Sequence, residues 1–125
     1  MWTPALASEI LLFMTPREAI GPVIERLRDM TIDRIIVFGS TAAGETHKDS
    51  DLDIAVVVPD QENGADFNRT EFALEVRKHL RDVNAQVALD IVVYTVSEFE
   101  KLASQASSLR AEIIEGGETV YERAG

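Results

Sequence analysis

Apolar residues along the chain switch between helical spacing and short continuous runs. Repeats three and four residues apart predict helices over about residues 16–30 and 67–83, one that starts after Thr95, and a short one over about 106–115. Continuous runs rich in β-branched residues predict strands over 32–38, 52–58 and 87–94, with a last short extended piece over 119–122. Alternation of this kind favours an α/β (α+β) domain.

Two of the predicted helix starts carry a capping box. Thr15 and Glu18 stand three residues apart with Pro16 at the first helical position, and Thr95 and Glu98 repeat the spacing. We expect an N-terminal extension over residues 1–15 and one domain over residues 16–125.

The composition is that of an ordinary globular domain, with 125 residues, 46% hydrophobic and 27% charged, and no cysteine. This length fits one domain, and the lack of cysteine excludes a disulfide framework and a thiolate metal site. No apolar run approaches the ~20 residues needed to span a bilayer. The apolar residues 10–14 lack the preceding basic residues of a signal peptide. We expect a cytoplasmic protein with no membrane partner.

The formal net charge of -10 bears on the class of ligand. The 12 basic residues are scattered and face 22 acidic ones, whereas proteins that hold duplex nucleic acid cluster Lys and Arg against the phosphates. The charge therefore argues against a nucleic-acid partner. Small anions chelated by a metal ion remain compatible with it, because the metal supplies the missing positive charge.

Three aspartates are placed at or inside predicted strands. Asp51 and Asp53 stand two residues apart at the start of the run 52–58, so that their side chains project to the same face. Asp90 interrupts the apolar run 87–93, where an unpaired carboxylate is costly. If the two strands are neighbours, the three carboxylates converge, and a hard divalent cation such as Mg²⁺ would offset their repulsion. We therefore predict a magnesium site at these aspartates.

A turn at Gly39 and Ser40 fits the same site. Gly39 ends the strand predicted over 32–38, and a turn of this composition lets backbone N–H groups and a hydroxyl approach a phosphate closely. A glycine-serine turn alone is a weak signal. Here, however, a ten-residue spacer, Thr41 to Ser50, separates the turn from Asp51-Leu52-Asp53.

The order Gly-Ser, ten residues, Asp-x-Asp resembles the minimal nucleotidyltransferase (MNT) family, a branch of the DNA polymerase β-like nucleotidyltransferase superfamily. The resemblance covers nearly the whole chain after about residue 16, including Asp90 and the closing segment IIEGGETVYE. It implies the nucleotidyltransferase fold, a mixed β-sheet of three to four strands flanked by helices.

The resemblance also implies a chemistry, the Mg²⁺-dependent transfer of AMP from ATP to a hydroxyl acceptor with release of pyrophosphate. By the same resemblance Asp51, Asp53 and Asp90 are the catalytic residues and hold two Mg²⁺ ions, about 4 Å apart as in other two-metal sites. Asp90 would ligate the catalytic ion and help to deprotonate the acceptor hydroxyl.

Nucleotide contacts are implied at Gly39-Ser40, for the β- and γ-phosphates, and at the adjoining Thr41. The chain departs from the family at Ala43, where an arginine often follows the Gly-Ser turn, so that a guanidinium able to grip a phosphate is missing. Lys48 or His47 would have to supply that charge, and we assign Lys48 as the nucleotide contact.

The size of the chain indicates that a partner takes part. A chain of 125 residues has room for the catalytic sheet and its helices and for little else, so the acceptor should come from a second subunit or another protein. In the minimal branch the resemblance suggests a helical HEPN-type toxin whose tyrosine is adenylylated, with this chain as the antitoxin in a homodimer or hetero-oligomer. Two alternatives stay open. One is an antibiotic-type enzyme that modifies a small molecule, and the other is a catalytically weak antitoxin that acts by direct binding.

Overall fold

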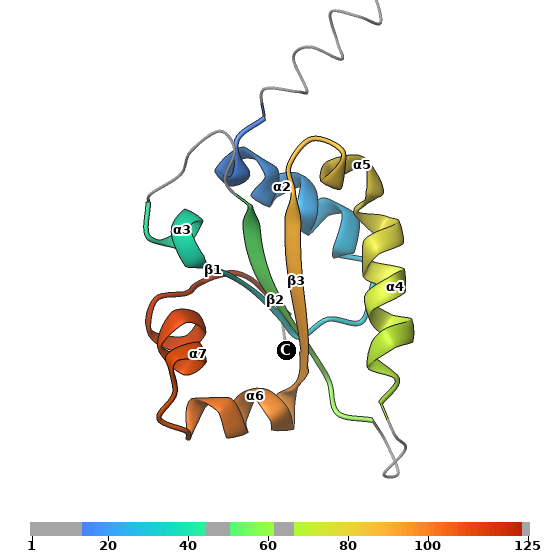
Figure 1. Ribbon diagram of the computed structural model, residues 1–125. Coiled ribbons are helices and arrows are strands. Elements are labelled where there is room, and N and C mark those ends of the chain that lie inside the picture. Colours follow the sequence, from blue (N-terminus) through green and yellow to red (C-terminus); the bar gives the residue numbers. More distant parts are fainter. Residues whose placement is uncertain (1–13, 45–50, 62–66, 124–125) are drawn as a thin grey trace, which may run out of the picture.

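A four-stranded mixed sheet forms the centre of the protein (Figure 1). The computed structural model describes residues 14–44, 51–61 and 67–123. The strands in chain order are β1 Arg34–Phe38, β2 Leu52–Val58, β3 Leu89–Thr95 and β4 Glu118–Glu122. Across the sheet the order is β3-β2-β1-β4, with β2 and β3 parallel and β1 antiparallel to β2 and β4. The predicted mixed sheet and its α/β class are confirmed.

The helical segments follow the predicted pattern, except that two of the predicted helices are each divided into two segments. They are α2 Pro16–Leu27, α3 Gly39–Ala42, α4 Arg69–His79, α5 Arg81–Asn84, α6 Val96–Ala103, α7 Ser108–Arg110 and the π-helical turn η2 Ala111–Glu115. The helix predicted over 67–83 is divided at Leu80, whose backbone ends α4 before α5 begins. The helix predicted over 106–115 consists of α7 and η2. Helix α3 was not predicted, because four residues are too few to show a period.

Both predicted capping boxes are present. The Thr15 hydroxyl accepts a hydrogen bond from the Glu18 N–H at 3.2 Å, and the Glu18 carboxylate accepts one from the Thr15 N–H at 3.3 Å. At the start of α6 the same two bonds join Thr95 and Glu98 at 3.2 and 2.8 Å. Because Thr95 is also the last residue of β3, its capping box makes the chain turn from strand to helix without a loop.

Helices cover both faces of the sheet (Figure 1). Alternate residues of a strand point to opposite faces. In β1, Ile35 and Val37 pack on the side of α2, α4 and α5, while Ile36 and Phe38 pack on the side of α6 and η2. The central strand β2 is buried along its length except at Asp53.

The third strand differs from the prediction. It begins at Leu89 rather than at residue 87, so that Asp90 is its second residue instead of lying in the middle of a buried run. Among the described strands β3 pairs with β2 alone, which makes it an edge of the sheet. The expectation of a buried Asp90 was therefore wrong: an apolar sequence run does not show whether a strand is central or at an edge.

Several predictions concern segments outside the described residues. These segments include most of the expected N-terminal extension, residues 1–13, and the loop residues 45–50 with His47 and Lys48. In the part of the chain that the structure describes, no helix combines the length and the apolar character needed to cross a membrane.

Candidate active site

Two of the predicted acids face each other across the parallel strands β2 and β3. Asp53 and Asp90 are each the second residue of their strand, and they are register partners. Neighbouring strands lie about 4.8 Å apart, and partners in register project to the same face of the sheet. Asp51 lies one residue before β2. The sheet thus brings Asp53 and Asp90 side by side, with Asp51 next to them along the chain.

The electrostatics identify Asp53 as the centre of this acidic group. Partial burial of its carboxyl is the main cause that raises the pKa of Asp53 above its ordinary value of 3.8. Repulsion from Asp90 is the next cause, followed by repulsion from Asp51 and then from Glu112. A carboxylate that three others repel is unfavourable when charged, which is the condition under which a bound cation stabilises a site most.

The carboxylates suit a hard cation but are not already arranged around one. Among residues 14–44, 51–61 and 67–123, no three His, Cys, Asp or Glu side chains are gathered closely enough to hold an ion. Asp51 and Asp90 are exposed, and their side chains can rotate toward Asp53 without disturbing the core. Carboxylate oxygens are the ligands that Mg²⁺ prefers. The donor set fits the predicted ion, and the assignment of Asp51, Asp53 and Asp90 as ligands stays a prediction.

The raised pKa gives a first testable prediction, for the protein in EDTA. The folded state binds a proton at Asp53 more tightly than the unfolded chain does, so this carboxyl lowers stability as the pH rises above about 3.8 and through its folded pKa. Asp53→Asn removes the charge, and we expect it to raise the melting temperature at pH 7 and to raise it less near pH 4. Thermal unfolding followed by circular dichroism at several pH values measures this difference.

Comparing the wild-type protein with Asp53→Asn isolates the contribution of the Asp53 carboxyl to stability. Carboxyls whose pKa is lowered by their partners, such as Glu98 beside Arg69, act on stability in the opposite direction but equally in both proteins. A stabilising effect of Asp53→Asn that grows on acidification would contradict the assigned environment of Asp53.

Gly39 is required by two independent features of the site. Its φ is +71°, a left-handed conformation that side chains rarely adopt. A Cβ atom at this position would lie 2.2 Å from Oδ2 of Asp53. The glycine therefore lets the chain turn out of β1 into α3 while the backbone packs against the Asp53 carboxylate.

The remaining residues of the turn differ in accessibility. Ser40 is partly exposed, whereas Thr41 is completely buried. The Thr41 hydroxyl has no hydrogen-bond partner in the described part of the chain. Its side chain is thus not presented to a ligand in this conformation, and Gly39 and Ser40 are the turn residues that a nucleotide can reach. Lys48, the fourth predicted nucleotide contact, lies outside the described residues.

A cavity of about 330 Å³ opens beside the turn. Its lining consists of Gly39, Ser40, Ala43, Glu112 and Gly116. The volume is within the usual range for small-molecule sites. Ala43, the position at which the family resemblance implies an arginine, lies on the wall of the cavity.

Sequence reasoning missed Glu112 and Gly116. Gly116 belongs to the closing segment that resembles the family, and Glu112 directly precedes it, but no spacing links either residue to the aspartates. They reach the site because η2 packs through Ile113 against the sheet face that also carries Ile36. This packing brings the π-helical turn, a feature often found at functional sites, to the same cavity as Gly39.

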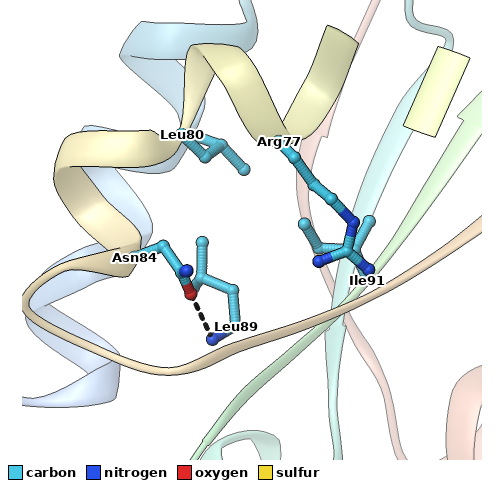
Figure 2. A pocket seen from close by; sticks show the side chains of 5 residues that line it. All are labelled: Arg77, Leu80, Asn84, Leu89 and Ile91. Carbon is cyan, nitrogen blue, oxygen red and sulfur yellow. Dashed lines mark hydrogen bonds between the residues drawn. The ribbon is translucent and has the colours of Figure 1, made fainter. Parts of the chain in front are cut away.

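Another cavity, of about 80 Å³, lies between α4, α5 and the edge strand β3 (Figure 2). Its lining residues are Arg77, Leu80, Asn84, Leu89 and Ile91. Figure 2 shows Oδ1 of Asn84 accepting a hydrogen bond from the N–H of Leu89, at 3.1 Å, at one end of the strand edge. At the other end Arg69 donates to the Val93 carbonyl at 2.5 Å. Leu89 and Ile91 of β3 face this cavity, so Asp90, which lies between them, projects to the opposite face of the strand.

Comparison with known proteins finds a family match over most of the chain. Residues 21–117 match the sequence profile of the family described as "Nucleotidyltransferase domain". No curated protein matches the chain significantly.

Two solved structures are similar. One is the crystal structure of a toxin-antitoxin with AMP-PNP, at 27% identity and a TM-score of 0.50, covering 83% of this chain and 73% of that chain. The other is a Sulfolobus solfataricus protein assigned as a nucleotidyltransferase, at 18% identity and a TM-score of 0.57, covering 98% of this chain and 91% of that chain. Because the second structure is only 18% identical to this chain, its similarity concerns the fold alone.

The profile match spans most of the chain and contains Gly39, Ser40, Asp51, Asp53 and Asp90. It agrees with the resemblance seen in the sequence and with the mixed sheet that pairs Asp53 with Asp90. The chain belongs to the nucleotidyltransferase domain family.

Proposed function

We propose that this chain transfers AMP from ATP to a hydroxyl group of a partner protein, with two Mg²⁺ ions, and acts as an antitoxin. The observation that carries the proposal is the pairing of Asp53 with Asp90 across β2 and β3, beside the Gly39-Ser40 turn. Acids next to a cavity of small-molecule size need a cation to accept a triphosphate.

In this proposal Asp51, Asp53 and Asp90 hold the ions. Bound Mg²⁺ would neutralise charge on the triphosphate oxygens and on the attacking and leaving oxygens of an in-line displacement. The partly buried position of Asp53 would fix the ligand set relative to the sheet, while Asp51 and Asp90 adjust around it.

The residues of the chain have distinct roles in the reaction. Backbone N–H groups of Gly39 and Ser40 orient the β- and γ-phosphates. The exposed Asp90 carboxylate accepts the proton of the acceptor hydroxyl, whose oxygen bonds to the α-phosphorus as the bond to pyrophosphate breaks. Because few groups take part, the rate would depend mainly on positioning and electrostatics.

The proposed partner is a helical HEPN-type toxin. The similarity to a toxin-antitoxin structure with AMP-PNP supports both a toxin partner and an adenine nucleotide. A tyrosine hydroxyl of the toxin would be the acceptor, and its adenylylation would neutralise the toxin. The cytoplasm is the compartment in which ATP and such a partner are both available.

Ala43 favours a second candidate function. Its methyl group on the cavity wall offers no charge to a phosphate, so a protein that inhibits its partner by binding alone, with weak or no transfer, is the alternative.

The test is a labelling experiment with the full chain, Mg²⁺ and a candidate helical HEPN-type toxin as the partner. ATP labelled at the α-phosphate should label the toxin, and ATP labelled at the γ-phosphate should not. A stable complex without label would instead support inhibition by binding. Label on an added aminoglycoside but not on the toxin would identify a small-molecule enzyme.

A further inference from the structure

The first turn of α2 reaches the nucleotide turn through Arg17. Its Nη2 donates a hydrogen bond to the carbonyl oxygen of Thr41 in α3 at 3.1 Å. The same atom contacts Oε2 of Glu118 in β4 at 3.1 Å. One guanidinium thereby joins α2, α3 and β4 at the point where β1 ends.

Helix α3 depends on such an anchor. It has four residues, and no side chain caps its start, so that its own backbone bonds cannot fix its orientation. The Thr41 carbonyl that Arg17 contacts also accepts a hydrogen bond from the Gly44 N–H at 3.2 Å. Arg17 therefore acts on the carbonyl that closes the turn carrying Gly39 and Ser40.

Glu118 holds Arg17 in place. It is the register partner of Val37, directly before the residues at which β1 turns into α3. The ion pair is about half exposed on both sides, and such pairs contribute little to global stability. The arrangement is thus better suited to orienting α3 than to stabilising the whole domain.

We propose that Arg17 is a positioning residue for nucleotide binding. It holds α3 so that the N–H groups of Gly39 and Ser40 face the cavity. This inference rests on the proposed function, because it assumes that the turn binds the phosphates of ATP.

Arg17→Ala should raise the KM for MgATP about tenfold and leave kcat within about threefold, since a displaced turn weakens binding before it affects the acids. Arg17→Lys retains one donor and should recover part of the lost affinity. The matched control is Arg26→Ala on the same helix. That substitution removes an ion pair with Asp82 of similar exposure, which joins α2 to α5 away from the site.

A second measurement does not depend on activity. The N–H groups of Ala43 and Gly44 are hydrogen-bonded within the turn, to Gly39 and Thr41. In Arg17→Ala their amide hydrogen exchange should become about tenfold faster, and in Arg26→Ala it should not change.

The two measurements separate the possible outcomes. Unchanged exchange at Ala43 and Gly44 in Arg17→Ala, or an unchanged KM in an active enzyme, would overturn the role of Arg17. Faster exchange together with a raised KM would support it. If the wild-type chain transfers nothing from MgATP but the exchange becomes faster, the proposed function fails while the anchoring of α3 by Arg17 is supported.

Discussion

Asp53→Asn is expected to lower kcat for AMP transfer at least about 1,000-fold at saturating MgATP, while the melting temperature stays the same or rises. A loss of this size corresponds to about 4 kcal/mol, in the range expected when a divalent ion loses a charged ligand. Asparagine keeps the shape of the side chain and one oxygen, so the change in charge is the main perturbation. The measurement combines a transfer assay with thermal unfolding of the same preparation.

Asp29→Asn is the matched control for this substitution. Asp29 is exposed in the turn after α2, away from the acidic group. The same chemical change there should leave both kcat and the melting temperature unchanged. If Asp53→Asn retained activity within tenfold of the wild type, the carboxylate would not be a metal ligand. If it unfolded the domain, its role would be structural.

Gly39→Ala is expected to reduce transfer about 100-fold while lowering the melting temperature by only roughly 5 °C. The positive φ costs about 1–2 kcal/mol for a residue with a Cβ atom, which accounts for the change in stability. The larger effect on activity has another cause. The new methyl group would collide with Oδ2 of Asp53, and the short carboxylate would have to rotate out of the ligand set.

Gly44→Ala separates the two causes. Gly44 also has a positive φ, +79°, but a Cβ atom there meets nothing within 4 Å. It should therefore show a similar fall in melting temperature with little loss of transfer. Equal losses of transfer in the two alanine variants would mean that backbone strain, rather than the contact with Asp53, accounts for the effect.

Local sequence patterns predicted much of the fold because they act over a few residues. The capping residues Thr15 and Thr95 start their helices as expected, and the apolar run 52–58 is a strand over the predicted residues. Boundaries were less accurate where neighbours decide them, as at Leu80, which divides a helix that the spacing predicted to be continuous. The prediction that Asp90 lies in a buried strand was wrong for the same reason. Whether a strand lies at the edge is a property of the whole sheet.

The sequence by itself determined the family of the chain and the candidate residues for its chemistry. Gly39, Ser40, Asp51 and Asp53 are close in the chain, and their spacing is enough to identify the family and to predict a phosphate turn followed by a metal site. These features can be predicted because strand periodicity and turn geometry relate residues within about ten positions of one another.

Only the tertiary structure decided what surrounds those residues. The parallel register that pairs Asp53 with Asp90, the cavity wall formed by Glu112, and the contact of Arg17 with Thr41 all join segments far apart in the chain. Each depends on how the sheet is ordered and on which helix packs on which face. Such long-range contacts leave no periodic signal in one sequence, because the separation between the contacting residues is set by the connections of the fold rather than by local geometry.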